Sequence, residues 1–133
     1  MSYRLLQLPD MLISDLEFQK DQYTLIFSDA SIIKVMDAAR QRTSWRQSGR
    51  IVVKGDFDDG VDASKIEFPK KVQGGEFQDN VFVYHDTIRL PCRVSGDVGL
   101  SLIFEQLDQP FIINGEKLEV VLTDTPKYVA HVD

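Results

Sequence analysis

Apolar and polar residues alternate along most of this chain, and that period of two constrains its fold more than any other feature. In the stretch IRLPCRV, residues 88–94, every second residue is apolar, and the residues between them are two arginines and a proline. Successive side chains of a β-strand point to opposite faces, so this pattern puts one face in a core and the other in water. Pro91 lacks the N–H donor of a ladder, which places this strand at a sheet edge or beside a bulge.

Similar short stretches recur between turn-forming residues, as is typical of an all-β domain. Turns are predicted at residues 20–22, 28–31, 85–86, 95–97 and 114–115. The last, Asn114-Gly115, suits the type I′ turn of a tight hairpin. We therefore predict an all-β, mostly antiparallel fold, a β-sandwich or small β-barrel of about 8–10 strands. Residues 1–133 are long enough to bury one core and are expected to form a single domain.

Residues 37–49 depart from the alternation. Asp37 suits a helix N-cap and Gly49 a C′ position, so at most one short helix near residues 38–48 is predicted. The alternative is an extended strand, whose basic side chains would point to one side and Trp45 to the other. The basic residues concerned are Arg40, Arg42, Arg46 and Arg50.

These four arginines and Trp45 are the first candidate binding site. Guanidinium groups beside an aromatic face can bind a carboxylate, a phosphate or a single-stranded base. The alternative is a solvated stretch that pairs with nearby acidic residues, with Trp45 as a core anchor.

The second candidate is the acidic stretch GDFDDGVDASKIE, residues 55–67, which resembles a calcium loop. Counted from Asp56, however, the glycine that an EF-hand requires at position 6 arrives one residue early, and the flanks read as strands rather than helices. A looser cation site or a solvated turn remains, and we expect the turn, with no metal and no cofactor. The acidic residues concerned are Asp56, Asp58, Asp59 and Asp62.

Charge and cysteine content narrow the class of partner and the compartment. The formal net charge of −6 argues against binding to a nucleic-acid backbone and favours a basic protein partner. Cys92 is the single cysteine, so an intramolecular disulfide is excluded and a cytoplasmic location is expected. No stretch has the ~20 apolar residues that would span a membrane.

Nucleotide-binding and hydrolase motifs are absent, so we expect a non-enzymatic interaction protein. In size, acidic charge and lack of catalytic motifs the chain resembles the small cytosolic binding proteins of bacteria, including immunity proteins that neutralise a toxin. This resemblance implies an immunity- or inhibitor-like role and carries over no residues.

Two other functions stay open. One is a β-barrel that binds a small anionic ligand, its cavity lined by aromatic residues such as Phe82, Tyr84 and Phe104. The other is an enzyme that uses carboxylates of the acidic stretch. A homodimer formed through an edge or a face is a further expectation.

Overall fold

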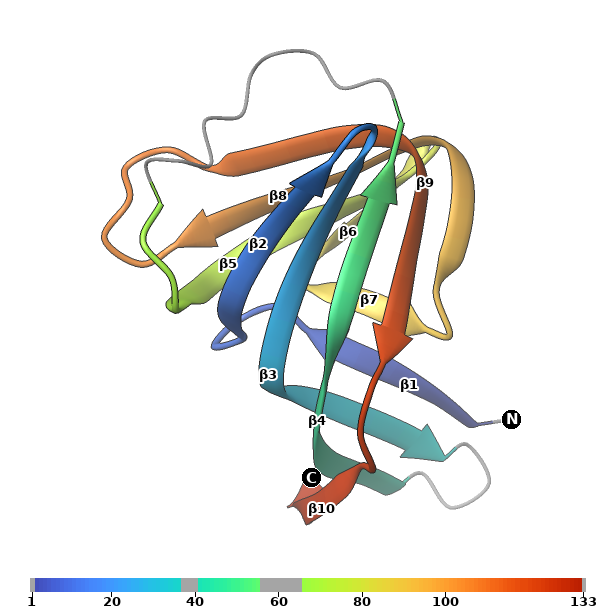
Figure 1. Cartoon of the computed structure of the whole chain (residues 1–133). Coiled ribbons are helices and arrows are strands. Elements are labelled where there is room, and N and C mark those ends of the chain that lie inside the picture. Colours follow the sequence, from blue (N-terminus) through green and yellow to red (C-terminus); the bar gives the residue numbers. More distant parts are fainter. Residues whose placement is uncertain (1, 37–40, 56–65, 133) are drawn as a thin grey trace.

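The computed structural model describes residues 2–36, 41–55 and 66–132, and it shows an all-β, antiparallel fold (Figure 1). This part of the chain forms ten strands and no helix. In chain order they are β1 (Ser2–Gln7), β2 (Leu12–Gln19), β3 (Gln22–Met36), β4 (Gln41–Lys54), β5 (Lys70–Asp79), β6 (Phe82–His85), β7 (Thr87–Leu90), β8 (Arg93–Phe104), β9 (Phe111–Leu122) and β10 (Lys127–Val132). The predicted fold class is confirmed.

Six of the strands close into a barrel in the order β4, β9, β8, β5, β2 and β3, with β3 pairing back to β4. The seam between β2 and β5 is short, because its register holds just two pairs, Leu12 with Lys71 and Ile13 with Lys70. Beyond the seam, residues 76–79 of β5 pair with β6 instead. β6 is therefore an extra strand outside the barrel.

The other strands outside the barrel belong to an outer sheet, which Figure 1 shows below the barrel. β3 and β4 are long enough to continue into this sheet, where they pair with each other and carry β1 and β10. β7 pairs with β1 and ends the sheet. Pro91 directly follows β7, so the prediction of a sheet edge at this proline is confirmed.

The turn predicted at residues 28–31 is wrong, because these residues lie inside β3. The register with β4 shifts between Phe27 and Ala30, and Asp29 adopts a φ of 47°. Such an extra residue forms a β-bulge, which bends a strand. The bulge lies where β3 leaves the barrel and enters the outer sheet. Small polar residues that tolerate positive φ serve a bulge as well as a turn.

The turns predicted at residues 95–97 and 114–115 are wrong for a related reason. A register shift after Ser95 marks a bulge in β8, and Gly96 has a φ of 114°. Asn114 and Gly115 lie within β9, opposite β8, rather than at a hairpin tip. A Cβ on Gly115 would lie 2.6 Å from the carbonyl oxygen of Lys54, so a glycine is required where β9 passes the end of β4.

The alternating residues fill one continuous core inside the barrel and under the outer sheet. Ile88, Leu90 and Cys92 are buried, as their spacing predicts. The largest fully buried side chains are Phe27, Phe104, Leu6, Leu8, Met11, Ile13, Leu25, Ile32, Ile51, Ile88, Leu100 and Leu102. Each Å² of apolar surface removed from water contributes about 25 cal/mol of stability, so this core is the main stabilising element.

The helix predicted near residues 38–48 is wrong for residues 41–48, which form part of β4. The strand alternative is confirmed there: Arg42, Arg46 and Arg50 are exposed on one face, while Thr43 and Gln47 are buried on the other. Pairing with β3, β9 and β10 satisfies the backbone of β4 along its length, which outweighs the local helix signals. Residues 37–40 lie outside the described part of the chain. Within that part, no helix is present that could span a membrane.

Candidate functional site

Of the residues predicted as binding sites, the structure describes Arg42, Trp45, Arg46 and Arg50, all on β4. The alternation of the strand separates them, because the arginines lie on the outer face and Trp45 on the inner one. The other candidates, Arg40, Asp56, Asp58, Asp59 and Asp62, lie outside the described residues. Pairing of the arginines with the acidic stretch therefore stays a prediction.

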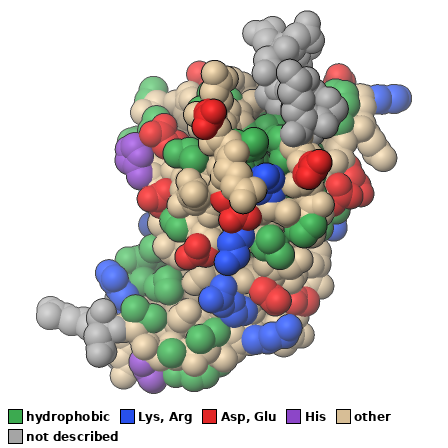
Figure 2. Space-filling view, turned by 90° about the vertical axis from the view of Figure 1, so that its left-hand side faces the viewer, with side chains coloured by type: hydrophobic (Ala, Val, Ile, Leu, Met, Phe, Trp, Pro, Cys, Tyr) green, Lys and Arg blue, Asp and Glu red, His purple; other side chains and the backbone are tan. Residues whose placement is uncertain are grey.

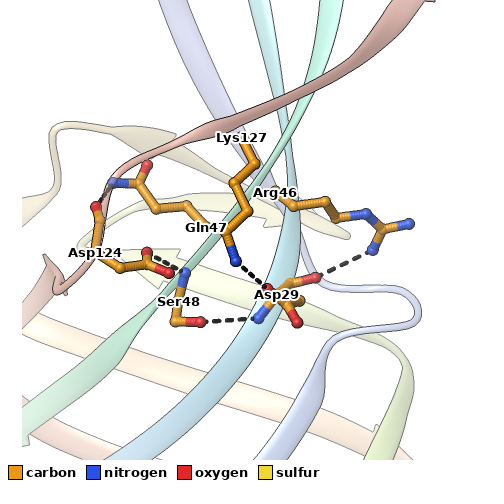
Figure 3. Close-up of polar contacts among 6 residues, drawn as sticks. All are labelled: Asp29, Arg46, Gln47, Ser48, Asp124 and Lys127. Atoms are coloured by element: carbon orange, nitrogen blue, oxygen red, sulfur yellow. Dashed lines mark hydrogen bonds and ion pairs between the residues drawn. The ribbon is translucent and has the colours of Figure 1, made fainter.

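Arg46 contributes to the structure of the β3 bulge (Figure 3). Its Nη1 donates a hydrogen bond to the carbonyl oxygen of Asp29 over 3.1 Å, and the Asp29 N–H donates to the Ser48 hydroxyl over 3.1 Å. The Nζ of Lys127 lies 3.8 Å from the Asp29 carboxylate. The guanidinium of Arg46 thus satisfies a backbone carbonyl that the bulge removes from the ladder.

Asp124 holds the C-terminal segment against the same part of β4 (Figure 3). Its carboxylate accepts a hydrogen bond from the Ser48 N–H over 2.8 Å, and its carbonyl oxygen accepts one from the buried Gln47 amide over 2.6 Å. These contacts fix the start of β10 on β4. This polar cluster therefore forms a structural clasp between the C-terminal segment, β4 and the β3 bulge.

Trp45 is half-buried and helps to anchor β10. Its indole Nε1 donates to the Thr43 hydroxyl over 2.8 Å, and Tyr128 packs edge-on against the ring with centroids 5.3 Å apart. The anchoring role expected for Trp45 as an alternative to binding agrees with this packing. Its ring also lines a cleft of about 450 Å³ on the inner side of the outer sheet.

Arg50 lines an open groove of about 590 Å³ on the outside of the barrel. Lys54, Arg93 and Lys117 also line it, and Glu119 lies among them. Arg93 Nε is 3.4 Å from the Glu119 carboxylate, and both side chains are well exposed. Exposed ion pairs of this kind contribute little free energy, since water and salt screen them.

The exposed hydrophobic residues of the hairpin formed by β5 and β6 make a surface that the sequence analysis missed. Val81, Phe82, Val83 and Tyr84 are 87, 60, 50 and 43% exposed, in consecutive positions. Single exposed apolar residues are common on protein surfaces, but a contiguous group of them is less common and makes this hairpin a candidate site. Its sequence signal is the run VFVY, which lacks the polar residues that interrupt the other strands.

One backbone edge of β6 is unpaired, because within the described chain this strand pairs with β5 alone. The Asp86 N–H donates to the Gly75 carbonyl across the same pair of strands, over 2.8 Å. Directly opposed residues of an antiparallel ladder alternate between hydrogen-bonded and non-hydrogen-bonded pairs. Val83 lies three pairs along from Asp86, so it is in a non-hydrogen-bonded pair, and its N–H and C=O point away from β5. This edge can accept another strand.

The tip of the hairpin is held rigidly against the β8 bulge by Asn80. Its Nδ2 donates to the Ser95 carbonyl over 3.0 Å and to the Asp79 carboxylate over 2.9 Å, and its Oδ1 accepts from the Asp97 N–H over 3.0 Å. The Asn80 N–H also donates to the Asp97 carbonyl, over 2.8 Å. The exposed apolar residues therefore project from a hairpin whose tip is hydrogen-bonded to β8.

Four carboxylates lie on or beside this hairpin: Glu76, Asp79, Asp86 and Asp97. Glu76 faces His85 across the strand pair, with 3.4 Å between its carboxylate and Nδ1. Asp79 faces Phe82 in the register. Figure 2 shows that charge is unevenly distributed on one face of the molecule, with acidic side chains mainly in its upper half and basic ones in its middle and lower parts.

The predicted ligand cavity lined by Phe82, Tyr84 and Phe104 is wrong. Phe104 is fully buried in the core, while Phe82 and Tyr84 are exposed on β6. Tyr84 stacks on Phe77 with ring centroids 5.8 Å apart, which fixes its ring on the hairpin surface. Phe82 and Tyr84 lie on the surface because β6 is outside the barrel wall.

Cys92 is buried, with 5% of its surface exposed. Burial, together with the smaller effect of the negative charges of Asp79 and Glu119, raises the pKa of its thiol from 9.0 to about 11. The thiol is therefore protonated at neutral pH and behaves as a small apolar side chain. In the described residues, no three His, Cys, Asp or Glu side chains gather as potential metal ligands.

The fold and this surface define an antiparallel β-barrel protein that presents an apolar edge hairpin. Comparison with protein-family models, with curated proteins and with solved structures found no match.

Proposed function

We propose that this protein is a non-enzymatic binding protein whose β6 edge takes up an extended, basic segment of a partner protein. The observation that supports this most directly is the apolar, unpaired edge of a hairpin that Asn80 holds in place. An added strand would gain backbone hydrogen bonds from positions such as Val83, and its side chains would cover the exposed apolar residues. An immunity- or inhibitor-like role toward a basic protein is the most specific form of the proposal.

The charge around the hairpin supports a basic partner. Glu76, Asp79 and Asp97 border the apolar residues, and the whole chain carries a net charge of −6. Complementary charges speed the encounter and select among partners, while the apolar strand supplies affinity. The rigid hairpin lowers the entropy that binding would otherwise lose.

We also propose a cytoplasmic location for the protein. A single buried thiol with no disulfide partner supports this location, because reducing compartments keep such thiols free.

The test compares two lysine substitutions at matched positions. Val83 on β6 and Val129 on β10 are 50 and 49% exposed, and both lie on strands at a sheet edge. The partner would be isolated at low ionic strength and identified, and its Kd for each purified variant would be measured by calorimetry. We expect Val83→Lys to weaken binding by at least about tenfold and Val129→Lys to change it less than about twofold.

The same experiment separates the other occupants of this edge. Binding that weakens equally in both variants, or that does not weaken as salt rises, would contradict a basic partner at β6. A dimer that Val83→Lys abolishes would show that a second copy of this chain occupies the edge, and would also overturn the proposal.

A further inference from the structure

The cleft beside Trp45 has a lining that suits an anionic ligand. It holds about 450 Å³ on the inner side of the outer sheet, between Pro91, which follows β7, and Pro126, which precedes β10. Arg4 and Lys34 are its charged residues, and no acidic side chain is among the described residues that line it. The local charge is thus opposite to that of the whole chain.

Arg4 of β1 and Lys34 of β3 are direct partners in the strand register. Directly opposed side chains have Cβ atoms about 4.5–5.5 Å apart, so two like charges there destabilise the sheet. Both residues are half-buried, which reduces the screening by water, and no ion pair joins either one to a described acidic residue. A bound anion between them would remove this repulsion.

The groove at Arg50 differs from the cleft in two respects. Glu119 already supplies a counter-charge within the groove, and Arg93, its ion-pair partner, projects into solvent. The cleft has neither a described counter-charge nor strongly exposed cations. A ligand anion is therefore better recognised in the cleft than in the groove.

Trp45 adds a flat apolar surface to the same cleft. The hydrogen bond from its Nε1 to Thr43 and the edge-on contact with Tyr128 fix the orientation of the indole. A fixed aromatic ring beside two cations matches a ligand that joins a ring to an acidic group. The volume lies at the small end of the range for ligand sites, about 300–1,000 Å³.

We infer that this cleft binds a small aromatic anion, whose carboxylate or phosphate lies between Arg4 and Lys34 and whose ring packs on Trp45. This inference is independent of the partner-binding edge on β6, since the two surfaces share no residue. The ligand is recognised by chemistry common to aryl carboxylates and aryl phosphates.

Fluorescence provides a direct test, because Trp45 is the single tryptophan of the chain. Benzoate and phenyl phosphate would serve as the two aromatic anions, acetate and inorganic phosphate as anions without a ring, and benzyl alcohol as a ring without charge. We expect at least one aromatic anion to change the Trp45 emission in a saturable way, with an affinity at least about tenfold above those of its two fragments. The better of the two would identify the acidic group.

Charge-removing variants locate the response. Arg4→Gln and Lys34→Gln should each weaken the aromatic anion at least about fivefold, while Arg93→Gln in the groove should leave it unchanged. In the absence of ligand, Lys34→Gln should keep or raise the melting temperature, because the opposed charge is gone. That result also shows that the variant is folded.

Three outcomes would overturn the inference. The first is no saturable change with either aromatic anion at millimolar concentration. The second is equal binding by wild type and both cleft variants. The third is a loss of binding in Arg93→Gln, which would place the ligand in the groove.

Discussion

The hydrogen bonds by which Asn80 holds the hairpin tip against β8 can be tested by a double-mutant cycle with Gly96. Asn80→Ala removes three side-chain hydrogen bonds, to Asp79, Ser95 and Asp97. All three are exposed, so water replaces part of their strength and each contributes about 0.5 kcal/mol. Asn80 also has a φ of 58°, which costs alanine about 1 kcal/mol more than asparagine. The expected loss of unfolding free energy is therefore about 2–3 kcal/mol.

Gly96→Ala perturbs the same hydrogen bonds from the β8 side. Gly96 has a φ of 114°, and a Cβ on it would overlap the Asn80 side-chain amide. The backbone strain costs about 1–3 kcal/mol, and the overlap must also displace the amide from its hydrogen bonds. In the Asn80→Ala background no amide remains to be displaced. The double variant should thus lose about 1 kcal/mol less than the sum of the single losses.

Urea unfolding, followed by the fluorescence of Trp45, measures all four free energies. Asn80→Gly is the control for the backbone term, since glycine accepts the positive φ and loses the hydrogen bonds alone. Its expected loss is about 1–2 kcal/mol. Single effects that add to within about 0.3 kcal/mol would refute the coupling between the hairpin tip and the β8 bulge.

Three further predictions concern the barrel wall, the buried thiol and the clasp of the C-terminal segment. Gly75→Ala should lower the unfolding free energy by about 2–3 kcal/mol in the same urea assay, because its Cβ would overlap the Ser101 carbonyl across the barrel wall; an effect below 0.5 kcal/mol, by the same estimate of overpacking, would contradict the close strand spacing there. Cys92 should react with a thiol reagent at pH 8 at least about 100-fold more slowly in the folded than in the urea-unfolded protein, because its raised pKa leaves few thiolates, and equal rates would refute its burial. The wild type should lose stability as pH rises from 9.0 to about 11, because the unfolded chain then releases the thiol proton more readily, and a Cys92→Ala variant should lack this loss. Asp124→Ala should cost about 1 kcal/mol and speed amide exchange in β10, since the bond to the Ser48 N–H is lost, and unchanged exchange would show that other contacts hold β10.

The alternation of residues was sufficient to predict the fold class, because burial on one face of a strand is a local property. It predicted the opposite faces of Trp45 and Arg46 once β4 is extended, and the sheet edge at Pro91. It failed at Asp29, Gly96 and Gly115, since bulges and close strand crossings use the same residues as turns. Those positions are distinguished by strand pairing, which sequence spacing alone does not reveal.

The candidate sites were predictable to a smaller extent. The run VFVY at residues 81–84 has the composition of a strand, but its exposure follows from the position of β6 outside the barrel. The pairing of Arg4 with Lys34 depends on the register of strands about thirty residues apart, so neither residue carries a local signal. Arg46 was predicted as a ligand-binding residue, and its hydrogen bond to the Asp29 carbonyl gives it a structural role.

The continuity of β3 and β4 has a consequence for cooperativity. Each strand passes from the barrel into the outer sheet as one ladder, interrupted by a single bulge at Asp29. To melt the outer sheet alone would leave the barrel ends of both strands frayed, so we expect one denaturation transition shared by both parts. Separating the two parts would expose the apolar residues packed between them, including Ile32 on the underside of the outer sheet, and would make both parts prone to aggregate. The outer sheet is thus an inseparable extension of the barrel strands rather than a detachable module.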